Sequence, residues 1–192
     1  MTTGAVILAA GAGSRLGGVA KALLRAGGES YLERIMRTAR GAGAREVVVV
    51  VGQPYGERVS EAARAMGGIV VENPAPERGM ASSVALGFAA IADTSVDAAW
   101  LWPVDHPFVA HATLAWLTAA LGTHAAAQPR FEGRGGHPPL VARTLFRALA
   151  ACTDSPNGAR GVLAAADVVA VAVGDRAVVQ DIDTPADLAE AG

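Results

Sequence analysis

The sequence predicts an α/β fold: a three-layer, Rossmann-like structure with an open, mostly parallel sheet and helices on both faces. Short apolar runs alternate with helix-like segments up to about residue 121, as in chains whose parallel strands are joined by helical crossovers. The apolar runs are continuous, which is typical of strands buried on both faces. The chain has 192 residues, which fit one domain (residues 1–192) and suffice for a sizeable core.

The first strand is expected over residues 5–10, a short apolar run that ends at a glycine. A glycine-rich loop follows. The first helix is expected to begin at Ser30, because Ser30 and Glu33 match the S-x-x-E capping box. Apolar residues recur on one face of that helix until Gly41 ends it. The start of the chain therefore predicts a strand, a loop and an amphipathic helix in that order.

Three further strands and helices follow in the same order. The strands are expected over residues 47–51, 69–71 and 98–104. The helices are expected from a turn at 52–54 to about residue 66, and over residues 81–92 and 113–121. Four strands that alternate with four helices complete the prediction of a parallel sheet.

The pattern is less regular after residue 123. Residues 133–136 are expected to form a loop or hairpin, and 140–141 a strand. Short helices are expected over 144–151 and 159–166, and strands over 168–173 and 177–179. A last helix is expected to begin at Thr184-Pro185, where a capping residue precedes a proline at the first helical position.

Composition excludes several classes of protein. Hydrophobic residues make up 52% of the chain and charged residues 18%, yet no apolar run reaches the roughly 18 residues of a membrane-spanning helix. No basic stretch precedes the first apolar run, so we expect neither a signal peptide nor a membrane partner. The net charge of −2 without a basic patch argues against nucleic acid. Cys152 is the only cysteine, which favours a buried, inert thiol and a cytoplasmic location.

Lys21 is the only lysine, and it ends a glycine-rich loop that begins at Gly11. Glycines let backbone N–H groups approach a ligand closely, so the loop is a candidate seat for phosphate groups. The loop fits neither common phosphate motif. Leu16 replaces the third glycine of a dinucleotide-binding fingerprint, and Lys21 stands between alanines, not in the G-K-[ST] of a P-loop.

Other polar residues follow predicted strands and should lie at the same edge of the sheet. Asp105 follows the fourth strand and is a candidate magnesium ligand; the alternative is a cap for the next helix. Asp183 stands between a strand and a helix start, where a metal ligand and a simple cap are both open. The segment from Gly79 to Ser83 begins a helix and could bind an anion or a base edge, or merely cap the helix.

These residues together resemble a known family. Leu8-Ala9-Ala10-Gly11-Ala12-Gly13-Ser14-Arg15-Leu16-Gly17, followed by Lys21, resembles the signature loop of the MobA-like nucleotidyltransferases, and most closely that of the molybdenum cofactor cytidylyltransferases. Five further segments resemble motifs of that subfamily in the same order: Gly79–Ser83, Val104–Phe108, Gly136–Pro138, Gly158–Gly161 and Asp181–Pro185. The resemblance covers nearly the whole chain. It implies a fold of the nucleotide-diphospho-sugar transferase type.

The resemblance implies a role for each matched residue. Base and ribose would be held by backbone contacts at Leu8, Ala9, Ala10 and Gly11, with Gly79, Ser82 and Ser83 near the base. The triphosphate would be bound by Gly13, Ser14, Arg15 and Lys21. Asp105 and Asp183 would hold Mg²⁺, and His137 would lie at the acceptor site. Arg15, Lys21 and Asp105 would be catalytic.

The resemblance also implies substrates and partners. In this family Ala10 in the L-A-A-G form goes with cytidine, which points to CTP. The implied acceptor is a phosphorylated small molecule such as molybdopterin, and a molybdoenzyme that receives the finished cofactor is an implied maturation partner. The implied reaction moves CMP from CTP to that acceptor and releases pyrophosphate.

The chain departs from the family pattern at several positions. Ala20 replaces the usual proline before the lysine, the loop has one extra residue, and His106 and Ala81 replace a glutamine and a serine. These departures leave the acceptor open. Two alternatives remain: a related transferase that uses GTP or makes an activated sugar or isoprenoid precursor, and a protein that binds a nucleotide or cofactor without transferring anything.

Overall fold

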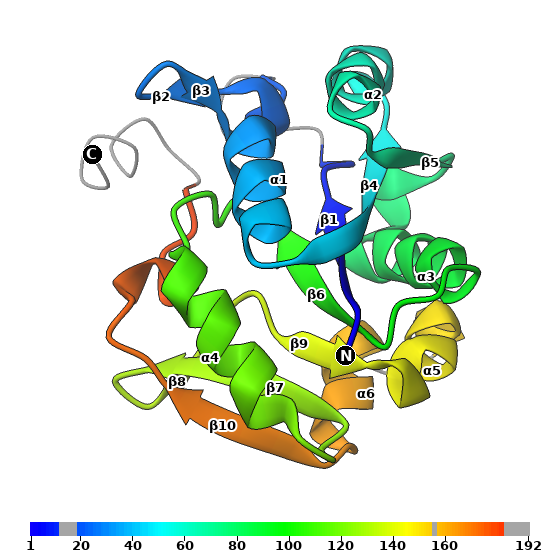
Figure 1. Ribbon diagram of the computed structural model, residues 1–192. Helices are drawn as coiled ribbons and strands as arrows, with labels where there is room; N and C mark the ends of the chain where they lie inside the picture. The colour runs from blue at the N-terminus through cyan, green and yellow to red at the C-terminus, as the bar shows by residue number, and fades with distance from the viewer. Residues whose placement is uncertain (12–18, 155–156, 183–192) are drawn as a thin grey trace.

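The computed structural model describes residues 1–11, 19–154 and 157–182. Within these residues one sheet of eight strands runs through the molecule in the order β10-β7-β9-β6-β1-β4-β5, with β8 paired to β7 (Figure 1). Its strands are β1 (Thr3–Leu8), β4 (Ala44–Gly52), β5 (Ile69–Asn73), β6 (Ala98–Pro103), β7 (Ala126–Phe131), β8 (Arg134–Gly135), β9 (Leu140–Ala142) and β10 (Val168–Ala172).

The sheet is mostly parallel, as the sequence predicts. β1, β4, β5 and β6 form one parallel block, and β7 is parallel to β10. β9 joins these two blocks by pairing antiparallel to both β6 and β7. All the long strands of both blocks therefore end at the same edge of the sheet.

Six α-helices of the described residues cover the two faces of the sheet. They are α1 (Tyr31–Gly41), α2 (Gly56–Ala65), α3 (Met80–Ala92), α4 (His111–Leu121), α5 (Phe146–Ala150) and α6 (Gly158–Ala164). α1, α2 and α4 pack on one face, and α3, α5 and α6 pack on the other (Figure 1). This gives the three layers that the alternation of strands and helices predicts.

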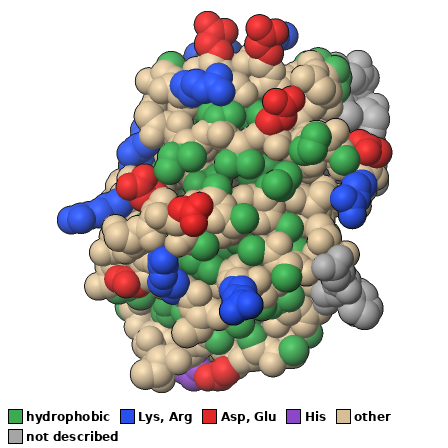
Figure 2. Space-filling view, turned by 90° about the vertical axis from the view of Figure 1, so that its right-hand side faces the viewer, with side chains coloured by type: hydrophobic (Ala, Val, Ile, Leu, Met, Phe, Trp, Pro, Cys, Tyr) green, Lys and Arg blue, Asp and Glu red, His purple; other side chains and the backbone are tan. Residues whose placement is uncertain are grey.

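The continuous valine run of β4 explains how both faces are filled. Val47, Val49 and Val51 belong to the core under α1 and α2. Val48 and Val50 belong to the core under α3. Successive strand residues point to opposite faces, so only a run that is apolar at every position can bury both. Figure 2 shows the outer side with α2, β5 and α3, where hydrophobic side chains gather in the middle among charges of both signs.

The expected capping box is present at the start of α1. The amide of Glu33 donates to the Ser30 hydroxyl, and the amide of Ser30 donates to the Glu33 carboxylate at 2.6 Å. Cys152 is buried as expected, and burial raises the pKa of its thiol. No helix among the described residues is long and apolar enough to cross a membrane.

Three features differ from the sequence prediction. Residues 177–179 do not form a strand but belong to a 3₁₀ helix, η6 (Arg176–Val179), because the Asp175 carboxylate caps it by accepting from the amide of Ala177. β7 was not predicted, since its residues 126–131 include a glutamine and a proline, which are rare in strands. A small hairpin of β2 (Arg25–Ala26) and β3 (Glu29–Ser30) lies before α1, and the sequence did not predict it. The helix expected at Thr184-Pro185 lies outside the described residues.

Candidate active site

The segments that follow β1, β4, β5 and β6 meet at one edge of the sheet. The amide of Ala9 donates to the carbonyl of Val50 at 2.8 Å, and the amide of Val104 donates to the carbonyl of Leu8 at 3.1 Å. The chain after β1 is thus held between β4 and β6 even beyond the end of the strand. The rule for open parallel sheets places ligands at this edge.

Ala10 lies in close contact with the end of β4. A Cβ atom on Gly52 would come within 3.1 Å of both the Cβ and the carbonyl oxygen of Ala10. Leu8, Ala9 and Ala10 are all buried, whereas Gly11 is exposed. Gly52 therefore lets the segment after β1 pack against β4.

Lys21 begins a short 3₁₀ helix, η2 (Lys21–Leu23), between the loop and the β2–β3 hairpin. Ala20 before it is buried with an extended backbone, and the carbonyl of Lys21 accepts from the amide of Leu24 at 3.0 Å. Lys21 is half-buried, and this hydrogen bond fixes its backbone. Gly13, Ser14 and Arg15 lie outside the described residues, so their predicted contacts with the triphosphate stay predictions.

A buried hydrogen-bond network joins the end of β5 to the start of α3. The amide group of Asn73, which is 1% exposed, donates to the hydroxyls of Ser82 and Ser83 at 2.9 Å each. The Ser82 hydroxyl donates in turn to the carbonyl of Gly79 at 2.7 Å. The N-cap residue of α3 is Gly79, and no side chain makes a capping hydrogen bond there. The two serines therefore do not act as side-chain caps of this helix. They fix the turn at Gly79 instead.

Asp105 carries the clearest sign of a missing partner. Its Oδ1 atom is buried and has no hydrogen-bond partner among the residues that the structure describes, and Nε2 of His106 lies 3.8 Å from it. The side chain is 26% exposed, so a ligand can reach it. Asp105 does not cap the following helix, because α4 begins at His111 with Ala110 as its N-cap residue. Such an unsatisfied carboxylate oxygen suits a hard divalent cation.

The second predicted metal ligand, Asp183, lies outside the described residues. Ile182, the last described residue, donates its amide to the carbonyl of Asp105 at 2.8 Å. The described residues contain no group of three or more His, Cys, Asp or Glu side chains that could hold a metal by themselves. Asp105 would therefore hold a cation together with substrate phosphates or with residues that are not described, as is usual for Mg²⁺.

The rings of His106 and His137 lie against each other at a tilt of 39°, and His106 adjoins Asp105. Their ring centroids are 5.0 Å apart, and the Nδ1 of His106 lies 3.3 Å from the carbonyl of Ala177 on η6. The backbone amide of His137 donates to the carbonyl of Val178 at 2.7 Å. Burial lowers the pKa of His137 to about 4, and His106 acts in the same direction. His137 is therefore neutral at physiological pH, and within the described part of the chain its buried Nδ1 has no hydrogen-bond partner.

A cavity of about 540 Å³ begins at this histidine. Pro103, two residues before Asp105, and Met80, next to Gly79, belong to its lining. The other lining residues come from α3, β6, β7, β8, β10, α6 and the segments beside them. The structure thus places His137, the predicted acceptor residue, in a ligand-sized cavity beside the edge that carries Asp105.

Sequence reasoning missed several residues of this region. The sequence assigns no role to Asn73, because its contacts depend on two serines that the fold brings to it. Arg130 lies on β7, a strand that was not predicted, and Arg160 lies in one of the matched segments without an assigned role. Both arginines line the cavity. Their common position could be found only from the order of strands in the sheet.

Comparison with known proteins supports a nucleotidyltransferase fold for this chain. The model of a family described as the MobA-like NTP transferase domain matches residues 5–171. A bifunctional IPC transferase and DIPP synthase of Rubrobacter xylanophilus is 48% identical over 86 residues, which are 42% of this chain. The match spans only 20% of that relative's length.

Solved structures resemble the whole chain. Rv0371c of Mycobacterium tuberculosis is 29% identical with a TM-score of 0.78, and the match covers 99% of this chain and 97% of that one. A complex of the same mycobacterial protein with manganese is 25% identical with a TM-score of 0.74, over 100% and 98% of the two chains. The similarity therefore extends over both the predicted nucleotide site and the cavity.

Proposed function

Because the chain belongs to the MobA-like NTP transferase family and is a nucleotidyltransferase, we propose that it moves CMP from CTP to a phosphate-bearing small molecule. The observation that carries the proposal is the shared sheet edge. There the chain after β1, the N-terminus of α3 and the unsatisfied carboxylate of Asp105 converge beside a ligand-sized cavity. We take residues 1–192 as one such domain, and the lone cysteine supports a cytoplasmic location.

The proposed reaction is a direct displacement at phosphorus. A phosphate oxygen of the acceptor attacks the α-phosphorus of CTP, and the bond from that phosphorus to the α–β bridging oxygen breaks. Pyrophosphate leaves with the electron pair of that bond. A phosphate monoester is largely dianionic near neutral pH, so no general base is required to remove a proton. Catalysis then consists of positioning the reactants and neutralising charge.

Lys21 and Arg15 supply positive charge in this scheme. Lys21 would stabilise the negative charge that grows on the leaving pyrophosphate, and Arg15 would bind the triphosphate. A single well-placed donor of this kind contributes about 3–4 kcal/mol to the transition state. The catalytic role of Lys21 is supported by its backbone, which a hydrogen bond holds in the 3₁₀ helix η2. A charge whose attachment point is already in place costs little free energy to orient during the reaction.

A divalent cation fits the carboxylate at Asp105. We propose Mg²⁺, held by Asp105 with Asp183, and the buried oxygen of Asp105 without a partner supports this choice. When bound, the cation would supply the positive charge that screens the phosphate oxygens. The manganese complex of the mycobacterial relative also supports a divalent cation at a site of this kind.

CTP and the acceptor rest on different observations. CTP is proposed from Ala10, whose packing against Gly52 fixes the backbone of the segment that would contact the base. Molybdopterin is the acceptor that the family resemblance favours, and a molybdoenzyme would then be the partner in cofactor maturation. A cyclitol phosphate is the second candidate, because the curated relative is named an IPC transferase.

Pyrophosphate release tests the proposed function directly. The protein is incubated with each of CTP, GTP, UTP and ATP in the presence of Mg²⁺, with molybdenum cofactor, with inositol 1-phosphate or with no acceptor. We expect release from CTP that depends on one acceptor. Release only from GTP would contradict the nucleotide assignment. Binding of CTP without release under any acceptor would contradict the proposed transfer reaction.

A further inference from the structure

His106 follows Asp105 directly, and several contacts fix its position after the end of β6. Its backbone amide donates to the carbonyl of Pro103 at 3.2 Å, and its carbonyl accepts from the indole N–H of Trp102 at 2.9 Å. Its ring lies against the ring of His137, with 5.0 Å between the two centroids. The backbone and the imidazole of His106 are therefore both held in place by the fold itself.

A hydrogen bond at one ring nitrogen of His106 determines which nitrogen carries the hydrogen atom. Nδ1 lies 3.3 Å from the carbonyl oxygen of Ala177 on η6. A carbonyl oxygen can only accept, so Nδ1 is the donor in this contact, and in the neutral imidazole the lone pair is then on Nε2. Histidines that bind metals usually have this arrangement, in which one ring nitrogen donates to a backbone carbonyl and the other binds the ion.

The separation between His106 and Asp105 matches that of two ligands of one cation. Nε2 of His106 lies 3.8 Å from Oδ1 of Asp105, which is too long for a hydrogen bond between them. Two atoms that are each about 2.1 Å from one ion lie about 3.0 Å apart at a right angle and about 4.2 Å apart when they are opposite. The observed separation falls between these limits. The side chain of Asp105 is 26% exposed, so a cation can reach the pair from solvent.

We propose that His106 binds the divalent cation of the active site through Nε2, together with Asp105, and that this nitrogen ligand makes the site prefer Mn²⁺ to Mg²⁺. The inference rests on the proposed function, because the cation is the one that Asp105 would hold for nucleotide transfer. Mg²⁺ prefers oxygen ligands, whereas imidazole suits transition metals. Mg²⁺ would still bind at this site, but more weakly than Mn²⁺.

Pulsed electron paramagnetic resonance of bound Mn²⁺ tests the nitrogen ligand. The probe is Mn²⁺ added to the full chain with CTP and without an acceptor, and protein that carries ¹⁵N only in its histidines is compared with unlabelled protein. We expect a nitrogen coupling to Mn²⁺ that changes with the label, because a nitrogen bonded to the ion receives part of its unpaired spin density. Absence of Mn²⁺ binding, or a spectrum that does not respond to the label, would overturn the inference.

A variant identifies which histidine is the ligand. His106→Gln replaces the nitrogen by a carbonyl oxygen or an amide, so the nitrogen coupling should disappear. Mn²⁺ affinity in titration calorimetry should fall at least about tenfold, whereas Mg²⁺ affinity should change much less. His111→Gln is the matched control, because His111 is exposed on α4, and it should keep both the coupling and the affinity.

Thermal unfolding shows whether both variants fold, and the labelled, unchanged protein tests the ligand even if His106→Gln does not. A coupling that persists in folded His106→Gln would overturn the assignment to His106. An equal loss of affinity for Mn²⁺ and Mg²⁺ would overturn the proposed preference.

These outcomes differ from those that test the transfer reaction. A histidine coupling to Mn²⁺ without pyrophosphate release from CTP under any acceptor would refute the transfer reaction but not the metal ligand. Pyrophosphate release from CTP, together with a Mn²⁺ spectrum that ignores the histidine label, would refute the metal ligand but support the transfer.

Discussion

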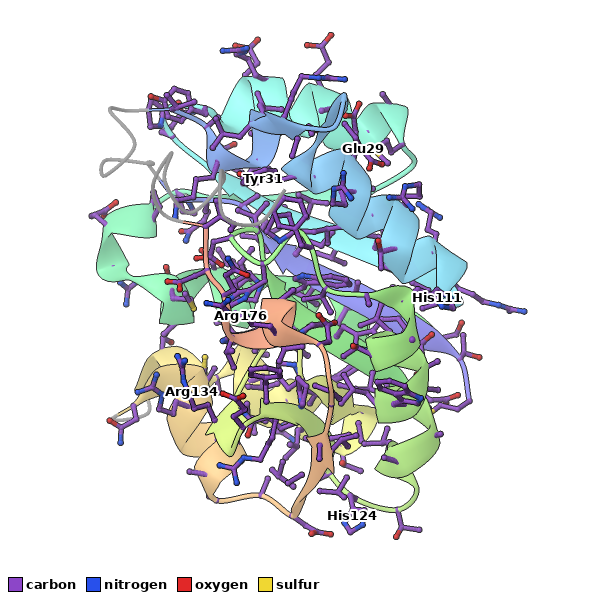
Figure 3. All side chains as sticks on the ribbon, turned by 90° about the vertical axis from the view of Figure 1, so that its left-hand side faces the viewer. Glu29, Tyr31, His111, His124, Arg134 and Arg176 are labelled. Carbon is purple, nitrogen blue, oxygen red and sulfur yellow. The ribbon has the colours of Figure 1, made fainter. Side chains whose placement is uncertain are left out.

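The hydroxyl of Thr113 donates a 2.7 Å hydrogen bond to the carboxylate of Asp175, although 62 residues separate the two in sequence. The same carboxylate oxygen accepts from the amide of Ala110, so Asp175 caps the first turn of α4 from a distant segment. In Figure 3 that turn, marked by His111, lies level with η6, marked by Arg176. Since η6 supplies the carbonyls next to His106 and His137, this cap links α4 to the segment that holds the two histidines.

Replacement of Asp175 by alanine should destabilise the fold. The change removes hydrogen bonds to Ala110, Thr113 and Ala177, and loss of a helix cap costs about 1–2 kcal/mol. Urea unfolding should show a lower free energy of unfolding. Glu61→Ala, at an exposed position on α2, serves as the control. Equal stability of both variants would show that the cap contributes nothing.

Replacement of Lys21 by alanine should lower turnover by about a hundredfold or more, because a donor to the transition state is lost. Lys21→Arg should restore little, since a planar fork cannot reproduce a compact point charge. Pyrophosphate release measures the effect, with the exposed Arg45→Ala as control. Near-normal release by Lys21→Ala would rule out its catalytic role.

Asp105→Asn should abolish the dependence of turnover on divalent cations. The amide keeps the shape of the side chain but loses the negative charge that a hard cation requires. Binding of Mn²⁺, followed by electron paramagnetic resonance, gives a second readout that needs no turnover. The exposed Asp93→Asn should behave like the unchanged protein. An unaltered Mn²⁺ titration in Asp105→Asn would place the cation elsewhere.

Asn73→Ala should loosen the start of α3. It removes the donors to Ser82 and Ser83 and leaves buried hydroxyls with fewer partners, which costs about 1–3 kcal/mol. We expect a higher KM for the nucleotide with a smaller change in kcat, because the turn at Gly79 would be less well fixed. The control is Asn157→Ala, where the side chain is exposed and does not cap α6. If Asn73→Ala leaves the KM for the nucleotide unchanged, the hydrogen bonds of Asn73 stabilise the fold but do not contribute to nucleotide binding.

His137 should make stability depend on pH. Its pKa is lowered from 6.5 to about 4, chiefly by burial, so between these values the unfolded chain binds more protons than the folded one. Its contribution is complete above pH 6.5 and is lost as the pH falls towards 4. The loss is up to about 3 kcal/mol, at roughly 1.4 kcal/mol per pKa unit.

Unfolding in urea at several pH values between 7 and 4 measures this effect. His137→Asn should flatten the dependence in that window, whereas the exposed His111→Asn should retain it. An equally steep loss of stability in His137→Asn would assign the effect to other groups.

The half of the fold built on β1, β4, β5 and β6 could be predicted because its signals are local. The valines of β4 and the capping box at Ser30 each specify their own element, and the rule for strand ends brought Ala10 and Asp105 to one edge. The half built on β7 and β10 could not be predicted in the same way. Pro129 and Gln128 do not suggest a strand, and β7 forms because β9 and β10, from later in the chain, pair with it.

The position of β9 has a consequence for how such a protein can evolve. Among the described strands it alone connects the block of β1, β4, β5 and β6 to the block of β7 and β10. Selection can therefore remodel the second block, which lines the cavity, while the first block and the predicted nucleotide site stay as they are. Laboratory recombination with a junction at β9 should exchange acceptor preference between relatives as a unit.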